Sequence, residues 1–429
     1  MQTQFDSAAL RDPDTAEAEK VLRKCVHCGF CTATCPTYVL LGDELDSPRG
    51  RIYLIKDMLE HERPATAAVV RHLDRCLSCL GCMTTCPSGV HYQHLIDHAR
   101  AHVERTYRRP LGERWLRAAL AMILPFPARL RVALGLAAWV PQRLRRSAAL
   151  PAPLRAMLGL AAVHAATPRS ALTLAPKPSV PRGRVALLLG CAQGVLTPQT
   201  HASSQRLLSA VGWEVVPIAG CCGALTHHLG RGEERDGFAG RLIENLRVAS
   251  AASEFAAIVV NASGCGTQLK DYGFMFRNHP RLAADAARFA ALARDITEVL
   301  ALTPLPVRPL PQLPVVAYHS ACSMQHGQKL DALPRRLLRE AGFELRDIAE
   351  GHLCCGSAGS YNILQPEIAA QLRDRKVAHI ERTGASVVAT GNVGCIMQLR
   401  SGSSLPVLHT VELLDWACGG PRPTALAPR

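Results

Sequence analysis

The sequence contains few aromatic residues and no long apolar segment. Phe, Trp and Tyr make up 5% of its 429 residues, and no uncharged apolar run reaches about 18 residues, the length that indicates a transmembrane helix. The first residues, MQTQFDSAALRDPD, are acidic and lack the apolar core of a secretory signal. We therefore expect a globular, cytoplasmic protein without a transmembrane helix.

Motifs that bind nucleotides or attack substrates are also missing. The sequence has no glycine-rich dinucleotide fingerprint, no P-loop, no serine nucleophile elbow and no paired carboxylates. We therefore do not expect this chain to bind flavin or to abstract a hydride. Substrate chemistry of that kind should belong to a partner, which this chain would connect to an acceptor.

Cysteine, by contrast, is abundant, with 17 residues. An odd number in short clusters within an intracellular chain indicates metal thiolates rather than disulfides. The formal net charge of +14 counts every cysteine as neutral, whereas each four-iron cluster with its four thiolates subtracts about two charges. The remaining positive charge is modest, so we expect no nucleic-acid partner. A basic zinc module that contacts nucleic acid is the contrasting hypothesis.

Two copies of one cysteine pattern lie in the first quarter of the chain. Each reads Cys-x2-Cys-x2-Cys-x3-Cys-Pro, from Cys25 and from Cys76, the pattern of bacterial ferredoxins with two 4Fe-4S clusters. In such runs the last cysteine of one copy binds the cluster of the other copy. Two zinc sites with four cysteines each would not require this x3-Cys-Pro spacing at the end of each run. We predict one cluster on Cys25, Cys28, Cys31 and Cys86, and a second on Cys76, Cys79, Cys82 and Cys35.

The chain repeats itself from residue 183 onward. Three landmarks recur 131, 133 and 130 residues apart: Cys191 and Cys322, Cys221 and Cys354, Cys265 and Cys395. Strand and helix patterns alternate in each copy, and the cysteines follow the strands predicted at 184–189, 213–218 and 256–261. Because the carboxyl ends of parallel strands share one edge of a sheet, four thiols should converge in each repeat.

These thiols are candidates for further iron-sulfur clusters. Adjacent cysteines in a Cys-Cys-Gly (CCG) turn can reach one metal, and the alternative is a reduced structural thiol pair. The possible additional ligands are Cys191, Cys221, Cys222 and Cys265 in the first repeat and Cys322, Cys354, Cys355 and Cys395 in the second. Cys418 remains as a plain thiol.

The sequence thus predicts an α+β multidomain chain. We expect an α-helical ferredoxin domain at 1–107, including a helix over 47–62 that begins with Ser47 and Pro48, then a basic, proline-rich connector at 108–182. Two α/β CCG domains follow at 183–303 and 313–418. The connector is either a helical clamp or a basic amphipathic surface that contacts a membrane or partner through Trp115, Trp139, Arg143, Arg145 and Arg146.

Several histidines lie near these motifs. His91, His94, His98 and His102 share one face of a predicted helix. We expect a solvated face there, and the alternative is a ladder of haem or metal ligands. The histidines nearest the cysteines are candidates for tuning a cluster potential: His27, His227, His228, His319 and His326.

With two ferredoxin runs followed by AGCCGALTHHLG, NASGCG, QHGQKL and HLCCGSAGSYNIL, the chain resembles the iron-sulfur subunit of bacterial glycolate oxidase (glycolate dehydrogenase) over its whole length. The resemblance implies an electron-transfer subunit that relays electrons from FAD-containing subunits, which oxidise glycolate to glyoxylate, towards membrane quinone. Peripheral contact with the cytoplasmic face of the inner membrane would follow. The iron-sulfur subunit of anaerobic glycerol-3-phosphate dehydrogenase and lactate-utilisation proteins are the alternatives.

One departure concerns the CCG domains. Many of them end in Cys-x-x-Cys, whereas this chain has Gln268 after Cys265 and Gln398 after Cys395. Five-thiolate clusters of the heterodisulfide reductase type are therefore not expected. The residues leave two roles open for the CCG domains. In the first they belong to an electron relay and either dock the acceptor or hold further clusters. In the second they form a catalytic site for quinone or disulfide reduction.

Overall fold

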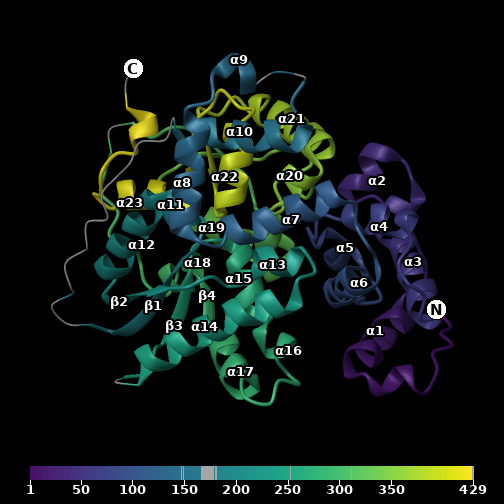
Figure 1. The fold of residues 1–429 in the computed structure, drawn as a ribbon. Helices are drawn as coiled ribbons and strands as arrows, with labels where there is room; N and C mark the ends of the chain where they lie inside the picture. The colour runs from purple at the N-terminus through teal and green to yellow at the C-terminus, as the bar shows by residue number, and fades with distance from the viewer. Residues whose placement is uncertain are drawn as a thin grey trace.

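The computed structural model describes residues 1–145, 147, 149–165, 178, 181–251, 253–310 and 312–427. A helical N-terminal region lies beside a larger body that contains two parallel sheets, and helices of the connector cover one end of this body (Figure 1). The predicted α+β architecture, with a helical N-terminal region and two α/β repeats, is confirmed.

The N-terminal region is made of short helices with well-defined starts. The Asp12 carboxylate accepts a hydrogen bond from the Thr15 amide at the start of α1, and the Ser47 hydroxyl accepts one from the Gly50 amide at the start of α3. The helix predicted over 47–62 is confirmed with slightly tighter ends. The helices are α1 (Pro13–Lys24), α2 (Pro36–Leu41), α3 (Pro48–Glu60), α4 (Ala67–Asp74), α5 (Gly81–Thr85) and α6 (Tyr92–Thr106).

The two CCG repeats fold into sheets of the same order. The first sheet runs β2-β1-β3-β4 and the second β6-β5-β7-β8, with every neighbouring pair parallel. The predicted strands are confirmed, while the short edge strands β4 and β8 were not predicted. The strands are β1 (Gly183–Gly190), β2 (Trp213–Ala219), β3 (Ala257–Val260), β4 (Ala293–Asp295), β5 (Val316–Tyr318), β6 (Leu345–Arg346), β7 (Val387–Thr390) and β8 (Val407–His409).

Helices connect these parallel strands. In the first repeat they are α11 (Gln193–Leu196), α12 (Pro198–Ala210), α13 (Ala224–His228), α14 (Gly232–Ser250), α15 (Ser263–Lys270), α16 (Tyr272–Met275), α17 (Ala283–Leu292) and α18 (Ile296–Leu300). In the second they are the π-helix η3 (Ser323–Gln328), α19 (Ala332–Glu340), α20 (Tyr361–Leu364), α21 (Pro366–Glu381), α22 (Val393–Arg400) and α23 (Thr410–Ala417). One buried core joins side chains of both sheets, including Val185 and Tyr318, so the repeats form a single packed body.

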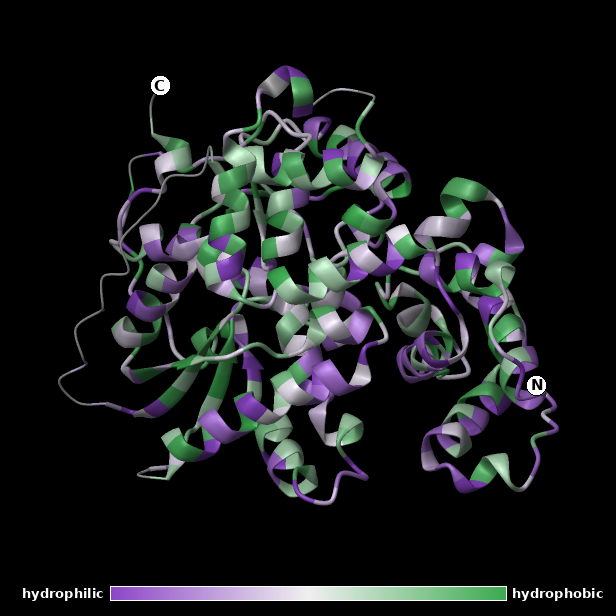
Figure 2. Cartoon of the chain, in the orientation of Figure 1, coloured by the Kyte–Doolittle hydropathy of each residue, from purple (hydrophilic) through white to green (hydrophobic). Residues whose placement is uncertain are grey.

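The described part of the connector contains the helices α7 (Leu111–Ile123), α8 (Pro127–Ala138), α9 (Gln142–Arg145) and α10 (Ala152–Ala165). Figure 2 shows apolar residues along α8 and α10, over the CCG domains. Among the described helices, none alone has the length and apolar character to cross a membrane, although α7 and α8, bent by 117°, meet that test as a pair. Arg146, part of the predicted basic surface, lies outside the described residues.

A buried carboxyl group sits where the two CCG domains meet. Glu412, in the first turn of α23, is 6% exposed and accepts a hydrogen bond from the His409 amide at 3.0 Å. Thr200 of the first domain lies 3.5 Å from the same carboxyl oxygen. Burial raises the pKa of Glu412 to about 7, so the folded chain keeps a proton here that an unfolded chain releases.

We expect the interface to lose stability as the pH rises through the range between the two pKa values of Glu412. Between about pH 4.5 and 7 the unfolded state has released the proton and the folded state retains it, so the free energy of unfolding should fall by about 3 kcal/mol. Glu412→Gln should remove this loss, measured as denaturant midpoints at pH 5 and pH 8. The exposed Glu381→Gln is the control, and equal pH slopes for wild type and Glu412→Gln would contradict the assignment.

Candidate iron-sulfur sites

The eight ferredoxin cysteines gather around two small cavities in the N-terminal region. One cavity is lined by Cys25, Cys28, Cys31, Cys82 and Cys86, and the other by Cys35, Cys76, Cys79 and Cys82. The last cysteine of the second run, Cys86, therefore lies with the first run, and Cys35 lies with the second. The structure thus brings together the sets that the crossed pattern predicts.

Burial favours the protonated form of these thiols. It raises the pKa of Cys31 to about 11 and, together with neighbouring thiolates, raises the pKa of Cys79 and Cys82 well above the usual range. A bound metal cation reverses this preference, because it stabilises the thiolate and releases the proton. Four thiols gathered around one small cavity form a donor set that fits a 4Fe-4S cluster.

A buried arginine outside the cysteine motifs supports the second set. Arg51 of α3 is 1% exposed, and its Nη1 lies 3.7 Å from Cys35 Sγ. Its other nitrogens donate to the His72 carbonyl at 2.7 Å and to Thr37 Oγ1 at 3.0 Å, and Asp46 Oδ1 lies 3.5 Å away. Burial alone would lower the pKa of Arg51, but the facing thiolates of Cys76 and Cys35, with Tyr92 and Asp46, raise it. The guanidinium is therefore a fixed positive charge beside this set.

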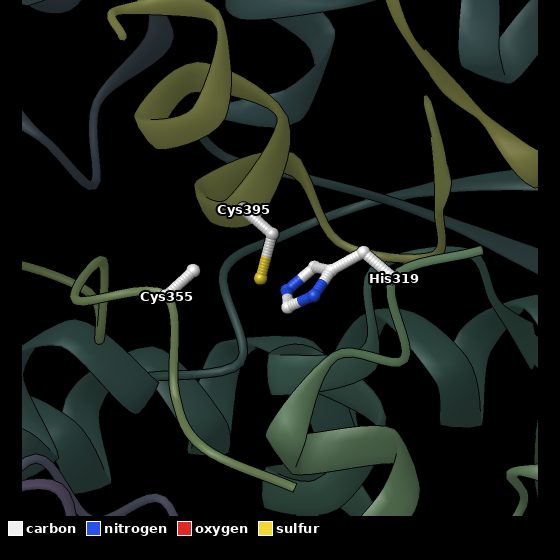
Figure 3. A group of neighbouring side chains, drawn as sticks. All are labelled: His319, Cys355 and Cys395. Carbon is white, nitrogen blue, oxygen red and sulfur yellow. The ribbon is translucent and has the colours of Figure 1, made fainter. Parts of the chain in front are cut away.

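The cysteines of the second CCG domain lie close together at the ends of β5, β6 and β7. Cys322 Sγ lies 3.7 Å from Cys354 Sγ. The ligand atoms of Cys355, Cys395 and His319 lie within 4.8 Å of one another, and Figure 3 shows the Cys395 sulfur next to the His319 ring. The predicted convergence of four thiols is therefore present in this repeat.

His319 adds a nitrogen donor to this group. It is 2% exposed, and within the described residues neither ring nitrogen has a hydrogen-bond partner. Burial lowers the pKa of His319 to about 3, so the ring is neutral and offers one lone pair and one N–H. Such a ring fits either a metal ligand or a donor to a thiolate. Leu188 occupies the corresponding place before Cys191, so the two repeats differ here.

The cysteines of the first CCG domain also converge. Hydrogen bonds from Cys191 and Cys222 lower the pKa of Cys221 to about 4. Cys265 contacts Cys222 on its other side. The Gly223 amide also donates to Cys221 Sγ at 3.4 Å. Unlike the second set, these four thiols line a large cavity beneath the connector helices.

The N-terminal region contacts the second CCG domain next to its thiols. Cys79 and Cys322 pack against the buried cluster that contains Cys354 and Leu77. The charge of Cys322 raises the pKa of Cys79, and the charge of Cys79 raises the pKa of Cys354. Thr84 Oγ1 lies 2.8 Å from His326 Nδ1, and the Tyr361 hydroxyl donates to the Arg75 carbonyl at 3.0 Å. The second ferredoxin set therefore adjoins the second CCG set.

The two CCG domains meet at the same edge. The Ser263 amide donates to the Gly391 carbonyl at 3.1 Å, and the hydroxyls of Ser263 and Ser323 lie 2.6 Å apart. Ser263 is two residues from Cys265, and Ser323 follows Cys322 directly. The thiol groups of the chain thus follow one another from the N-terminal region through the second CCG domain to the first.

The glutamines that replace the last cysteines have structural contacts. Gln398 accepts a hydrogen bond from Asn362 Nδ2 at 3.0 Å and donates to the Ala369 carbonyl at 3.1 Å. Gln268 Nε2 lies 2.9 Å from Met275 Sδ. Both side chains are buried and hydrogen-bonded to neighbouring segments, consistent with their not serving as cluster ligands.

The histidine face of α6 differs from both expectations. His94 contacts Asp271 at 2.9 Å, His98 lies 3.5 Å from Thr15, and His102 lies 3.0 Å from the Arg63 carbonyl. These side chains are half-buried, so the expectation of a solvated face is wrong. Their partners lie on three different segments, so these contacts serve helix packing and form no common metal site among the described residues.

Comparison with known proteins agrees with this geometry. The 4Fe-4S dicluster domain family matches residues 24–90, and the cysteine-rich domain family, CCG, matches residues 185–270 and 316–400. A crystal structure of a hypothetical protein from Helicobacter pylori shares the fold, with a TM-score of 0.54 at 11% identity over 97% of this chain and 74% of that one.

Two relatives that match nearly the whole chain have the same name. The chain is 42% identical to the glycolate oxidase iron-sulfur subunit of Escherichia coli, over 97% of this chain and 99% of that protein. It is 32% identical to a probable glycolate oxidase iron-sulfur subunit of Bacillus subtilis, over 94% and 95%. Lactate utilization protein A of Exiguobacterium is 30% identical but matches only 54% of this chain. The chain therefore belongs to the family of glycolate oxidase iron-sulfur subunits.

Proposed function

We propose that this chain is the electron-transfer subunit of a flavin-dependent glycolate dehydrogenase. In this role it takes electrons from FAD-containing partner subunits that oxidise glycolate to glyoxylate and passes them towards membrane quinone. Iron-sulfur clusters bound to the cysteine sets supply one-electron redox chemistry. The observation that carries the proposal is the junction at which Cys79 of the second ferredoxin set adjoins Cys322 and Cys354 of the second CCG domain.

The protein surface near Cys28 suits the electron donor. Cys28 is exposed, and two apolar neighbours are largely accessible: Val26 at 67% and Phe30 at 63%. Tyr53 of α3, 55% exposed, contacts His27 on the same face. An exposed apolar patch beside a redox site is typical of a docking surface. We place the flavoprotein partner on this face.

The opposite part of the chain suits a membrane. Large apolar side chains are exposed on α7 (Trp115 at 72%), on α8 (Leu136 at 68%) and at the residue that follows α8 (Trp139 at 88%). Arg143 and Arg145 come next in the chain. Apolar residues beside arginines are typical of helices that lie on an anionic bilayer. We therefore place the chain at the cytoplasmic face of the inner membrane, held there by peripheral contact.

Glycolate should reduce the clusters of the anaerobically assembled complex on anionic liposomes. We expect EPR signals of coupled 4Fe-4S clusters after glycolate addition, and flotation of the complex with the vesicles. Trp139→Ser with Leu136→Ser should abolish flotation and leave the glycolate-induced EPR signals unchanged. Clusters that dithionite reduces but glycolate does not would refute the electron-transfer role, and flotation of the double variant would refute the membrane contact.

A further inference from the structure

A cavity of about 410 Å³ lies between the connector helices and the first CCG domain. This volume falls in the range of small-molecule sites. Three parts of the chain line it. The first CCG domain contributes its four cysteines. The connector contributes Leu130 and Leu134 of α8 and Leu158 of α10, and the second CCG domain contributes Asn362 and Ile363 of α20 and Met397 of α22.

The second CCG domain is covered differently. Cys354 packs against Leu77 of the ferredoxin region and against Tyr361 and Leu372. The N-terminal region therefore covers the thiols of the second repeat, while the connector helices roof a cavity over those of the first. The pseudo-symmetric repeats thus present one thiol group to the ferredoxin clusters and the other to an apolar space.

Two polar groups without partners line this apolar cavity. Asn362 is 8% exposed, and within the described residues its Oδ1 and the buried Nδ1 of His228 have no hydrogen-bond partner. Burial, with the charge of Arg100, lowers the pKa of His228 to about 4, so its ring is neutral and can donate one hydrogen bond. An apolar ligand with oxygens that accept and donate hydrogen bonds would satisfy both groups.

The roof of the cavity is also apolar on its outer side. Leu130, Leu134 and Ala137 of α8 line the cavity, whereas Val132 and Leu136 of the same helix are 63% and 68% exposed. The outer face belongs to the surface placed against the bilayer above. Helix α8 thus separates the cavity from the lipid phase by one layer, a position suited to a ligand that is dissolved in the membrane.

We propose that this cavity binds the ring of a membrane quinone; the inference rests on the proposed function. The neutral His228 donates to a quinone carbonyl, and Asn362 Oδ1 accepts from the hydroxyl of the quinol. The two electrons that the complex takes from glycolate, with two protons from water, convert the two carbonyls of one quinone into the two hydroxyls of one quinol. The first CCG domain is therefore the acceptor side of the chain and the second is its donor side.

Photolabelling of the intact complex in liposomes tests the site directly. An azidobenzoquinone with a short isoprenoid tail should label peptides of α8 and α10, and excess unmodified quinone should suppress the labelling. Ala137→Trp places an indole ring in the cavity and should weaken labelling by about tenfold. Ala138→Trp, on the neighbouring exposed position of α8, should label as wild type does. Ala133→Trp provides a second blocking variant, and iron content verifies folding.

Labelling does not require electron flow, so the site and the relay fail separately. Equal labelling of Ala137→Trp, Ala133→Trp and wild type would overturn the proposal. Labelling confined to the flavoprotein would also overturn it, as would a cavity that an iron-sulfur cluster occupies without any quinone label on α8 or α10. Glycolate-reduced EPR signals in those same samples would leave the proposed function standing. Specific labelling of α8 and α10 without glycolate-induced signals would support the quinone site and refute the relay.

Discussion

Cys79→Ser should lower glycolate-driven quinone reduction by more than about a hundredfold. Losing a cluster ligand should exceed the 10- to 100-fold cost of losing a residue that only supports one. Cys79 lies where the second ferredoxin set adjoins Cys322 and Cys354 of the second CCG domain. The variant therefore removes the junction between the N-terminal region and the CCG domains, and the residues around Cys28 remain intact for the flavoprotein.

The measurement combines turnover with EPR of the glycolate-treated complex. Turnover should collapse, while a signal from the cluster assigned to Cys25, Cys28, Cys31 and Cys86 should still appear. Cys418→Ser is the matched control, because this partly buried thiol packs on the core of the CCG pair, away from both ferredoxin cavities. Near wild-type quinone reduction by Cys79→Ser would show that electrons bypass this junction.

Local sequence spacing explains why much of the site could be predicted. Cys25, Cys28, Cys31 and Cys35 fall within one loop and the start of α2, so a short pattern fixes their relative positions. The CCG thiols follow strand ends, and the right-handed order of parallel strands brings them to one edge. The repeat with matching landmarks also implies the matching sheet orders β2-β1-β3-β4 and β6-β5-β7-β8.

The relative placement of the domains could not be predicted, because contacts between distant residues determine it. Thr84 meets His326, and Arg75 meets Tyr361, across more than half of the chain. No sequence pattern indicates which of the two CCG repeats contacts the ferredoxin region. The cavity under α8 was equally hidden, since its three walls come from three separate segments.

Individual buried polar residues are a second kind of omission. In the sequence His319 is a neighbour of Cys322 alone, whereas in the structure its ring lies beside Cys355 and Cys395 of two other segments. The sequence carries one signal for Arg51, because this residue shares the buried stripe of α3 with Ile55 and Met58. An arginine at a core position of an amphipathic helix indicates a buried charge partner, but the sequence does not identify that partner.

Arg51→Met should lower the free energy of unfolding by about 3 to 5 kcal/mol, the cost of breaking a buried ion pair from one side. The change leaves the fully buried Asp46 with Arg75 at 2.6 Å and His72 at 2.9 Å as its remaining partners. It also removes the positive charge beside Cys35. We therefore expect both a lower denaturant midpoint and faster loss of iron to a chelator.

The neighbouring Arg49→Met separates this effect from a general loss of positive charge. Arg49 pairs with Glu44 at 2.7 Å on the surface, with side chains 34% and 45% exposed, and an exposed pair of this kind contributes about 0 to 1 kcal/mol. If Arg51→Met costs no more than Arg49→Met, Arg51 does not stabilise the second ferredoxin set, and the loop of Cys35 is held by Thr37 and backbone contacts alone.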